Sequence, residues 1–156
     1  MKKMILAVAT AFVFAACNNE KKEDHTGHGM NDMKTQEDSL MADVMDGHNV
    51  GMAKYGKLEA MQKKVKEAID SISKLPAKAQ QELAPYKTKL DSAAADLSYA
   101  LYAMDTWMGE FNMDSAKENM EARIKYLLNE KMKVGKVKEA ILGSLAKADS
   151  LLQNKH

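Results

Sequence analysis

The sequence has little of what usually constrains a small fold: one cysteine, two prolines, one tryptophan and three phenylalanines among 156 residues. A single cysteine cannot form a disulfide within the chain. The scarcity of proline leaves long stretches free to form helix, because proline removes a backbone donor. An excess of one charge is also missing, since 23 basic and 22 acidic residues give a net charge of +1. This balance gives no reason to expect a nucleic-acid partner.

Signatures of common enzyme classes are missing as well. The chain has no G-x-S-x-G, Walker, H-E-x-x-H or dinucleotide-binding motif. Its acids and lysines are spread along predicted helix faces, where such charges usually form solvated pairs. The sequence therefore predicts a protein that is not an enzyme.

The only strongly apolar run lies at the start of the chain, from Met4 to Phe14. It is too short to span a bilayer, which needs about 20 residues. It follows Lys2 and Lys3 and leads into Ala15-Ala16-Cys17, an order typical of a signal peptide. A cysteine directly after small residues resembles the lipobox of bacterial lipoproteins, although Phe14 stands where that family usually has leucine. An ordinary secretory signal with a chance cysteine is the alternative.

The lipobox resemblance implies that residues 1–16 are removed and that Cys17 carries acyl chains. Two or more chains would hold the protein firmly on a membrane, since each buried CH2 contributes roughly 0.8 kcal/mol. Asn18 stands where an inner-membrane retention signal would have aspartate, so the resemblance favours the outer membrane, on its periplasmic or surface face. Lys22-Glu23-Asp24 is similar to the charged surface-export signal of lipoproteins in Bacteroidota.

Residues 17–34 are predicted to form the acylated start and a flexible tether, because they are too polar to offset the entropy of ordering. The tether contains His25 and His28, followed by Met30 and Met33. Imidazole and thioether are ligands that soft Cu(I) accepts, so this segment is one candidate metal site. A polar linker that happens to contain histidines is the simpler interpretation.

Apolar residues recur at three- and four-residue spacing through most of the remaining chain, which predicts amphipathic helices. The pattern places them at about 36–74, 77–111 and 115–152. Thr35 and Ser115 each begin a stretch that resembles a capping box. Gly47, Gly51 and Gly56 weaken the first prediction, because glycine costs about 1 kcal/mol against alanine in a helix. Pro85 suits the first turn of a helix, which would divide the second stretch.

Three long amphipathic helices joined by short turns must bury their apolar stripes against each other. Residues 35–156 are therefore predicted to form one all-α domain, an elongated antiparallel up-down-up three-helix bundle with a coiled-coil-like core. The same stripes can pair between chains, so the sequence leaves the oligomeric state open.

Three pieces of the predicted bundle resemble recurring motifs of small Bacteroidota lipoproteins of unknown function, sometimes labelled viral A-type inclusion protein repeat. They are Val44 to Met52, Ala103 to Phe111 and Glu130 to Lys138. The family usually has His-Asp-Glu-Val-Met in the first piece, where this chain has His48-Asn49-Val50-Gly51-Met52. The resemblance supports the helical fold and the envelope location, and it supplies neither an activity nor a partner.

One end of the predicted bundle gathers methionines around a histidine. If Ser73 lies near Ala77, Met104 falls level with His48. Met45, Met52 and Met108 then lie within about one turn, Met120 lies at the same end, and Trp107 and Phe111 cap the group. A Cu(I) or other soft-metal site is one interpretation. A methionine-rich core layer is the simpler one, since methionine packs irregular gaps well. A groove for a partner helix and a role for methionine as an oxidant scavenger are further alternatives.

The sequence thus predicts a lipid-anchored envelope protein that serves as a non-catalytic helical binding or scaffold module, and it does not identify the partner. A periplasmic copper-binding protein that uses methionine and histidine is the alternative function. The two differ in what they require, because only the metal role needs sulfur and imidazole to converge.

Overall fold

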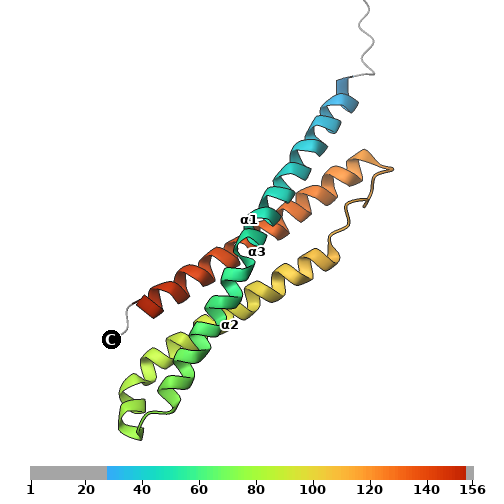
Figure 1. Ribbon diagram of the computed structural model, residues 1–156. Helices are drawn as coiled ribbons and strands as arrows, with labels where there is room; N and C mark the ends of the chain where they lie inside the picture. Colours follow the sequence, from blue (N-terminus) through green and yellow to red (C-terminus); the bar gives the residue numbers. More distant parts are fainter. Residues whose placement is uncertain (1–27, 154–156) are drawn as a thin grey trace, which may run out of the picture.

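The computed structural model describes residues 28–153, with side chains from residue 32 onward. It consists of three helices, α1 (His28–Ser73), α2 (Ala77–Glu110) and α3 (Met120–Gln153). The helices pack along each other as an elongated bundle (Figure 1). The predicted all-α three-helix fold is therefore confirmed. No helix in the described part of the chain is long and apolar enough to cross a membrane.

The core follows a heptad-like alternation of three- and four-residue steps on each helix, as expected for packing of this kind. On α2 the stripe is continuous from Leu90 to Trp107. On α1 and α3 it is interrupted by glycine and by charged residues, which are described below. The largest fully buried apolar side chains of the bundle are Leu58, Leu90, Leu97, Met104, Leu127 and Ile141.

Polar contacts between helices fix their directions. Tyr55 of α1 donates to Asp105 of α2 at 2.8 Å, and Gln62 donates to Ser98 at 2.8 Å, so residue numbers rise on one helix as they fall on the other. Between α1 and α3 they rise together, since Glu37 pairs with Arg123 at 2.9 Å and Asp43 with Lys131 at 2.7 Å. The helices therefore run up, down and up, as predicted.

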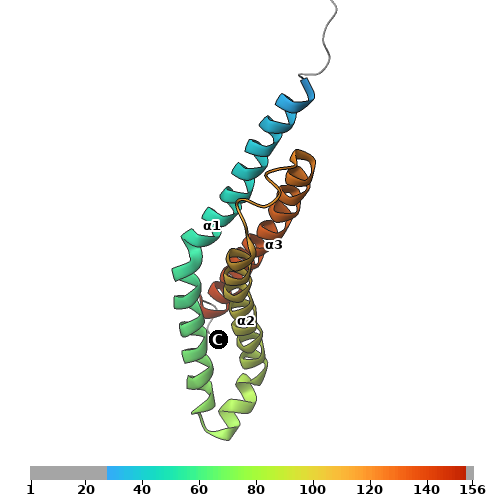
Figure 2. The same cartoon turned by 90° about the vertical axis from the view of Figure 1, so that its right-hand side faces the viewer.

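The helices are staggered rather than flush. Because α2 ends at Glu110, the first part of α1 has only α3 and the linker 111–119 beside it (Figures 1 and 2). At the opposite end, the hairpin of α1 and α2 extends past the end of α3 (Figure 1). The bundle has three helices only in its middle, and the start of α1 projects beyond the start of α3.

Two predicted helix starts were wrong. α1 begins at His28, so residues 28–34, predicted as part of the tether, are helical. Thr35 is no cap, since its hydroxyl donates to the Asp32 carbonyl at 2.8 Å. Extending a formed helix adds one backbone bond for each residue fixed, so α1 continues through a polar segment without proline.

α3 begins at Met120 and not at the predicted Ser115. Residues 113–118 form successive turns, in which Ala116 has a φ of 60°. That left-handed conformation is incompatible with continuing helix. The helix is capped instead by Asn119, whose side-chain oxygen accepts the Ala122 N–H at 3.0 Å.

Pro85 does not divide the second helix, because it lies inside the continuous α2. Proline in a helix interior removes one backbone bond and bends the helix, and Figure 2 shows α2 bent near its start. The first turns of α2 therefore do not follow α1 directly. As a result Asp105 lies opposite Tyr55, about two turns from the level predicted for its neighbour Met104.

Two glycines let α1 approach its neighbours closely. A Cβ built at Gly47 would lie 2.8 Å from Cγ1 of Val134, and one at Gly51 would lie 3.1 Å from Cδ1 of Ile141. Both glycines occupy core positions of the heptad pattern, and both are buried. The segment that glycine was predicted to weaken is thus a place where α1 and α3 pack closely.

Candidate functional site

The end of α2 carries a column of ring side chains. Trp107 stacks on Phe111 with 4.9 Å between ring centroids, and Phe111 lies 6.3 Å from Tyr126 of α3. His48 of α1 reaches the other end of the column, 5.8 Å from Trp107. Aromatic pairs at these separations add to the stabilisation from burial alone. The column ties all three helices together where α2 stops.

Beneath this column, Trp107 and Glu130 form a buried polar contact. The indole Nε1 donates to Glu130 Oε2 at 3.0 Å, and Lys133 Nζ donates to Oε1 at 2.8 Å. Glu130 is only 2% exposed, and each of its carboxylate oxygens accepts a hydrogen bond. The hydrogen bond from Lys133 to Glu130 raises the pKa of that lysine.

The linker between α2 and α3 is held by Arg123, which is 2% exposed. Its guanidinium donates to Glu37 at 2.9 Å and to the Ser115 carbonyl at 2.8 Å. It also lies 5.9 Å from the centroid of the Tyr126 ring. Tyr126 in turn accepts the Asn112 N–H at 2.8 Å. One cation thus joins α1 to the linker.

A surface hollow of about 250 Å³ lies beside the ring column. It is lined by three thioethers, one imidazole and two aromatic rings: Met45, His48, Trp107, Met108, Phe111 and Met113. α1 supplies Met45 and His48, the last turn of α2 supplies Met108, and the linker supplies Met113. We call these six residues the sulfur hollow.

The structure brings together only part of the predicted metal set. His48 and Met108 both line the sulfur hollow. Met104 is fully buried in the core against Gly51, and Met52 is 40% exposed outside the hollow. Of the four residues predicted for the bundle site, His48 and Met108 line the sulfur hollow, and Met52 and Met104 do not.

Three other predicted site residues are beyond this description. Cys17 and His25 lie outside the described residues, and His28 is described only as the first residue of α1. Within residues 28–153, no three side chains of the histidine, cysteine, aspartate and glutamate types come together as a metal-ligating group. Thioethers do not belong to that set, so the sulfur hollow is a separate kind of site.

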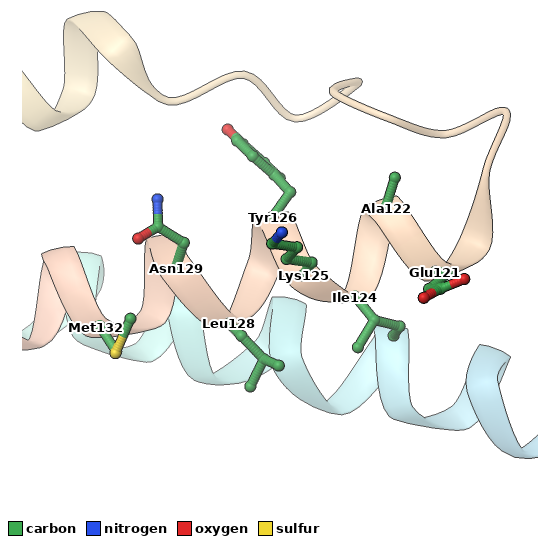
Figure 3. A pocket seen from close by; sticks show the side chains of 8 residues that line it. All are labelled: Glu121, Ala122, Ile124, Lys125, Tyr126, Leu128, Asn129 and Met132. Carbon is green, nitrogen blue, oxygen red and sulfur yellow. The ribbon is translucent and has the colours of Figure 1, made fainter.

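A second hollow, of about 710 Å³, lies along the first turns of α3. Ile124, Leu128 and Met132 project from the side of α3 opposite Tyr126 (Figure 3). Leu128 is 45% exposed and Met132 is 62% exposed. We call these three residues the α3 apolar row.

Sequence reasoning missed the two buried charges, Arg123 and Glu130. Both occupy heptad positions of α3, in step with Leu127 and Val134. A polar residue at such a position often sets register and neighbour choice in coiled coils. The pattern therefore contained a signal, since a charged side chain on an apolar stripe needs a partner on the facing helix.

Two further ionisable contacts lie nearby. The hydrogen bond to Asp105 raises the pKa of Tyr55, with smaller contributions from burial and from nearby acids. At the linker, the hydrogen bond from Lys117 lowers the pKa of Asp114. Neither group lies in the sulfur hollow or against the α3 apolar row. They are part of the framework that positions these surfaces.

Comparison with known protein families, with characterised proteins and with solved structures found no match. The resemblance to small Bacteroidota lipoproteins accordingly stays a prediction.

Proposed function

We propose that this protein is a lipid-anchored module of the cell envelope that is not an enzyme and that binds an acidic amphipathic helix of a partner protein on the α3 apolar row. The anchor would be the acylated Cys17. The observation that carries the binding role is the α3 apolar row itself, since Leu128 and Met132 expose large apolar side chains in line on one helix face.

The row has the length and spacing that a helix recognises. Ile124, Leu128 and Met132 follow each other at four-residue steps, so they cover about 12 Å of α3. A partner helix laid along them would bury its own residues at three- and four-residue spacing. Burying a leucine or methionine side chain contributes about 1.5–3 kcal/mol.

The charges beside the row indicate the chemistry of the partner. Lys125 borders the hollow, and Lys136 continues the same helix face after Met132. Among the described residues, neither lysine forms an ion pair. Glu121 is the one acid that lines the hollow. Acidic residues flanking an apolar stripe would complement this surface, and salt would weaken their contribution.

The position of the row suits an anchored protein. α1 and α3 begin at the same end of the bundle (Figure 1). Residues 18–27 separate Cys17 from α1, and their covalent length limits that separation to about 35 Å. Acylation of Cys17 would therefore hold the α3 apolar row within reach of other envelope proteins.

The binding role is tested with a protein that starts at Asn18, which keeps every core residue. Its affinity is measured by fluorescence anisotropy for a designed helical peptide with leucines at four-residue steps and flanking glutamates. A second peptide has lysine in place of each glutamate. We expect the acidic peptide to bind more tightly, and its affinity to fall with salt.

Leu128→Glu should lower the affinity for the acidic peptide by about tenfold or more, and a tenfold change corresponds to about 1.4 kcal/mol. Tyr102→Glu is the control, because Tyr102 is also a large exposed side chain (67% exposed, against 45% for Leu128) but lies on α2. Equal binding of both peptides, or an equal effect of both substitutions, would show that the row is not the site. Binding to vesicles of phosphatidylcholine and phosphatidylglycerol, without peptide binding, would assign the row to the lipid surface instead.

The anchor is tested separately in cells by Cys17→Ala. We expect this variant to leave the membrane fraction and to lose incorporated palmitate, because the acyl chains supply the attachment. Membrane attachment that survives the substitution would exclude a lipid anchor at Cys17.

A further inference from the structure

We infer that the sulfur hollow is a binding site for a soft monovalent metal ion, Cu(I) being the physiological candidate. Its donors are His48 and the thioethers of Met45, Met108 and Met113. Thioether and imidazole are the protein ligands that soft cations prefer over harder divalent ions. This inference does not depend on the α3 apolar row, which lies on other residues.

The donors come from three different parts of the chain. Met45 and His48 are one turn apart on α1, Met108 is in the last turn of α2, and Met113 is in the linker. Packing of the core fixes α1 and α2, whereas the linker is held by Arg123 and Tyr126. A site assembled in this way exists only in the folded bundle, so metal binding should also stabilise it.

His48 is prepared for such a role by its neighbour. Its Nδ1 lies 3.1 Å from the side-chain oxygen of Asn49. A hydrogen bond donated by Nδ1 to that oxygen leaves Nε2 with a lone pair for a metal. Residues that fix the tautomer of a ligating histidine in this way affect metal affinity without touching the metal.

The hollow also suits a cation with low charge. Met45, His48 and Phe111 are half-buried and Trp107 is almost fully buried, whereas Met108 and Met113 remain accessible at its mouth. No carboxylate lines the hollow, so nothing there would balance the charge of a divalent ion. The aromatic faces of Trp107 and Phe111 are themselves favourable neighbours for a cation.

Trp107 provides a direct readout, because it is the only tryptophan in the chain. The protein that starts at Asn18 lacks the only thiol, which would otherwise compete for the metal. It is titrated anaerobically with Cu(I), buffered by a chromophoric chelator, and in parallel with Ag(I), which does not change oxidation state. We expect one equivalent of either ion to quench Trp107 emission and to raise the melting temperature.

Substitutions then show whether the metal binds in the sulfur hollow or at another site. His48→Ala and the pair Met108→Leu with Met113→Leu should weaken binding, because each removes donors of the hollow. Met52→Leu and Met132→Leu are matched controls outside it. Asn49→Ala should lose about tenfold in affinity, whereas Asn49→Asp, which keeps an acceptor for Nδ1, should restore it.

Three outcomes would overturn the inference. In the first, binding is lost on replacing His25 and His28 by alanine and is unaffected by His48→Ala, which places the metal on the N-terminal segment. In the second, the control substitutions weaken binding as much as those in the hollow. In the third, neither ion binds at micromolar concentration. Circular dichroism of each variant establishes that the bundle is folded.

Discussion

Gly47 of α1 lies so close to Val134 of α3 that a Cβ on the glycine would stand 2.8 Å from the valine Cγ1. Real Cβ atoms essentially never approach another atom so closely, so with a side chain here either Val134 or the two helices must shift. The contact explains why a residue with poor helix propensity occupies a long helix. The close packing of two helices offsets the conformational cost of glycine.

Gly47→Ala should therefore lower the free energy of unfolding by about 1–3 kcal/mol, as overpacking typically does. Gly56→Ala is the matched control, because nothing lies within 4 Å of a Cβ at that position. It should raise stability by up to about 1 kcal/mol through helix propensity. Urea unfolding measures both. A stabilising effect of Gly47→Ala would show that α1 and α3 are not in close contact there.

The buried contact between Trp107 and Glu130 allows a similar comparison. Glu130→Gln keeps an oxygen that can accept from the indole, whereas Glu130→Leu leaves the N–H without a partner. We expect the leucine variant to be less stable than the glutamine variant by about 1–3 kcal/mol. Adding Trp107→Phe to Glu130→Leu should recover part of that difference. If the two Glu130 variants unfold at the same urea concentration, the indole contact contributes nothing.

The sequence predicts that α3 begins at Ser115, whereas in the structure it begins at Met120. Asn119 caps the helix, so Asn119→Ala should cost about 0.5–2 kcal/mol. The side chain of Ser115, the predicted cap, makes no such bond, and Ser115→Ala should change stability by less than about 0.5 kcal/mol. Thermal unfolding followed by circular dichroism compares the two. The reverse order of effects would place the start of the helix at Ser115.

Because of the contact between Tyr55 and Asp105, the free energy of unfolding should depend on pH in the alkaline range. The hydrogen bond raises the pKa of Tyr55, so its contribution is complete below the ordinary tyrosine pKa of about 10. It is lost as the pH rises through the raised pKa, because the ionised phenol no longer donates.

Tyr55→Phe removes that dependence. The difference in unfolding free energy between the natural protein and this variant should be positive near neutral pH and should shrink towards zero in strong alkali. Lysines that titrate in the same range, Lys133 among them, are common to both proteins and cancel in the difference. A difference that does not change with pH would mean that Tyr55 and Asp105 do not interact.

The three helices were predictable because their apolar stripes keep a regular spacing over many turns, as in Leu90 to Trp107 of α2. The ends of the helices were less predictable. Asn119 and Ser115 are both good caps by residue type, and the choice between them depends on turns that the pattern does not contain. The register of α1 against α2 was missed because Pro85 bends α2 rather than ending a helix.

The sequence placed only some residues of the sulfur hollow, because its apolar pattern does not show where the core stripe of α1 runs. Gly47 and Gly51 occupy the core positions of α1, and glycine does not register in an apolar pattern. The adjacent His48 and Met52 lie beside the stripe, since His48 is half-buried and Met52 is exposed. Only His48 lines the sulfur hollow. Met113 could not be placed from spacing, because it belongs to the linker and not to a helix.

The sequence separation of the contacts between the helices predicts an order for folding. The contacts of α1 with α2 close at separations of 36 and 50 residues and those of α2 with α3 at 23 and 51, whereas Glu37 with Arg123 and Asp43 with Lys131 close at 86 and 88. The longer closures cost more chain entropy and follow the shorter ones. We expect the hairpin of α1 with α2 and the hairpin of α2 with α3 to form before α1 pairs with α3.

In this order the first turns of α1 are the less stable end of that helix against local unfolding. Backbone amides of the first turns of α1, which have only α3 and the linker beside them, should exchange with deuterium sooner than those near Leu58 and Val65. Uniform exchange along α1 would contradict this view. The α3 apolar row lies beside this first part of α1, as the pairs of Glu37 with Arg123 and of Asp43 with Lys131 show. A partner bound there would therefore slow the opening of this end of the bundle and its proteolysis.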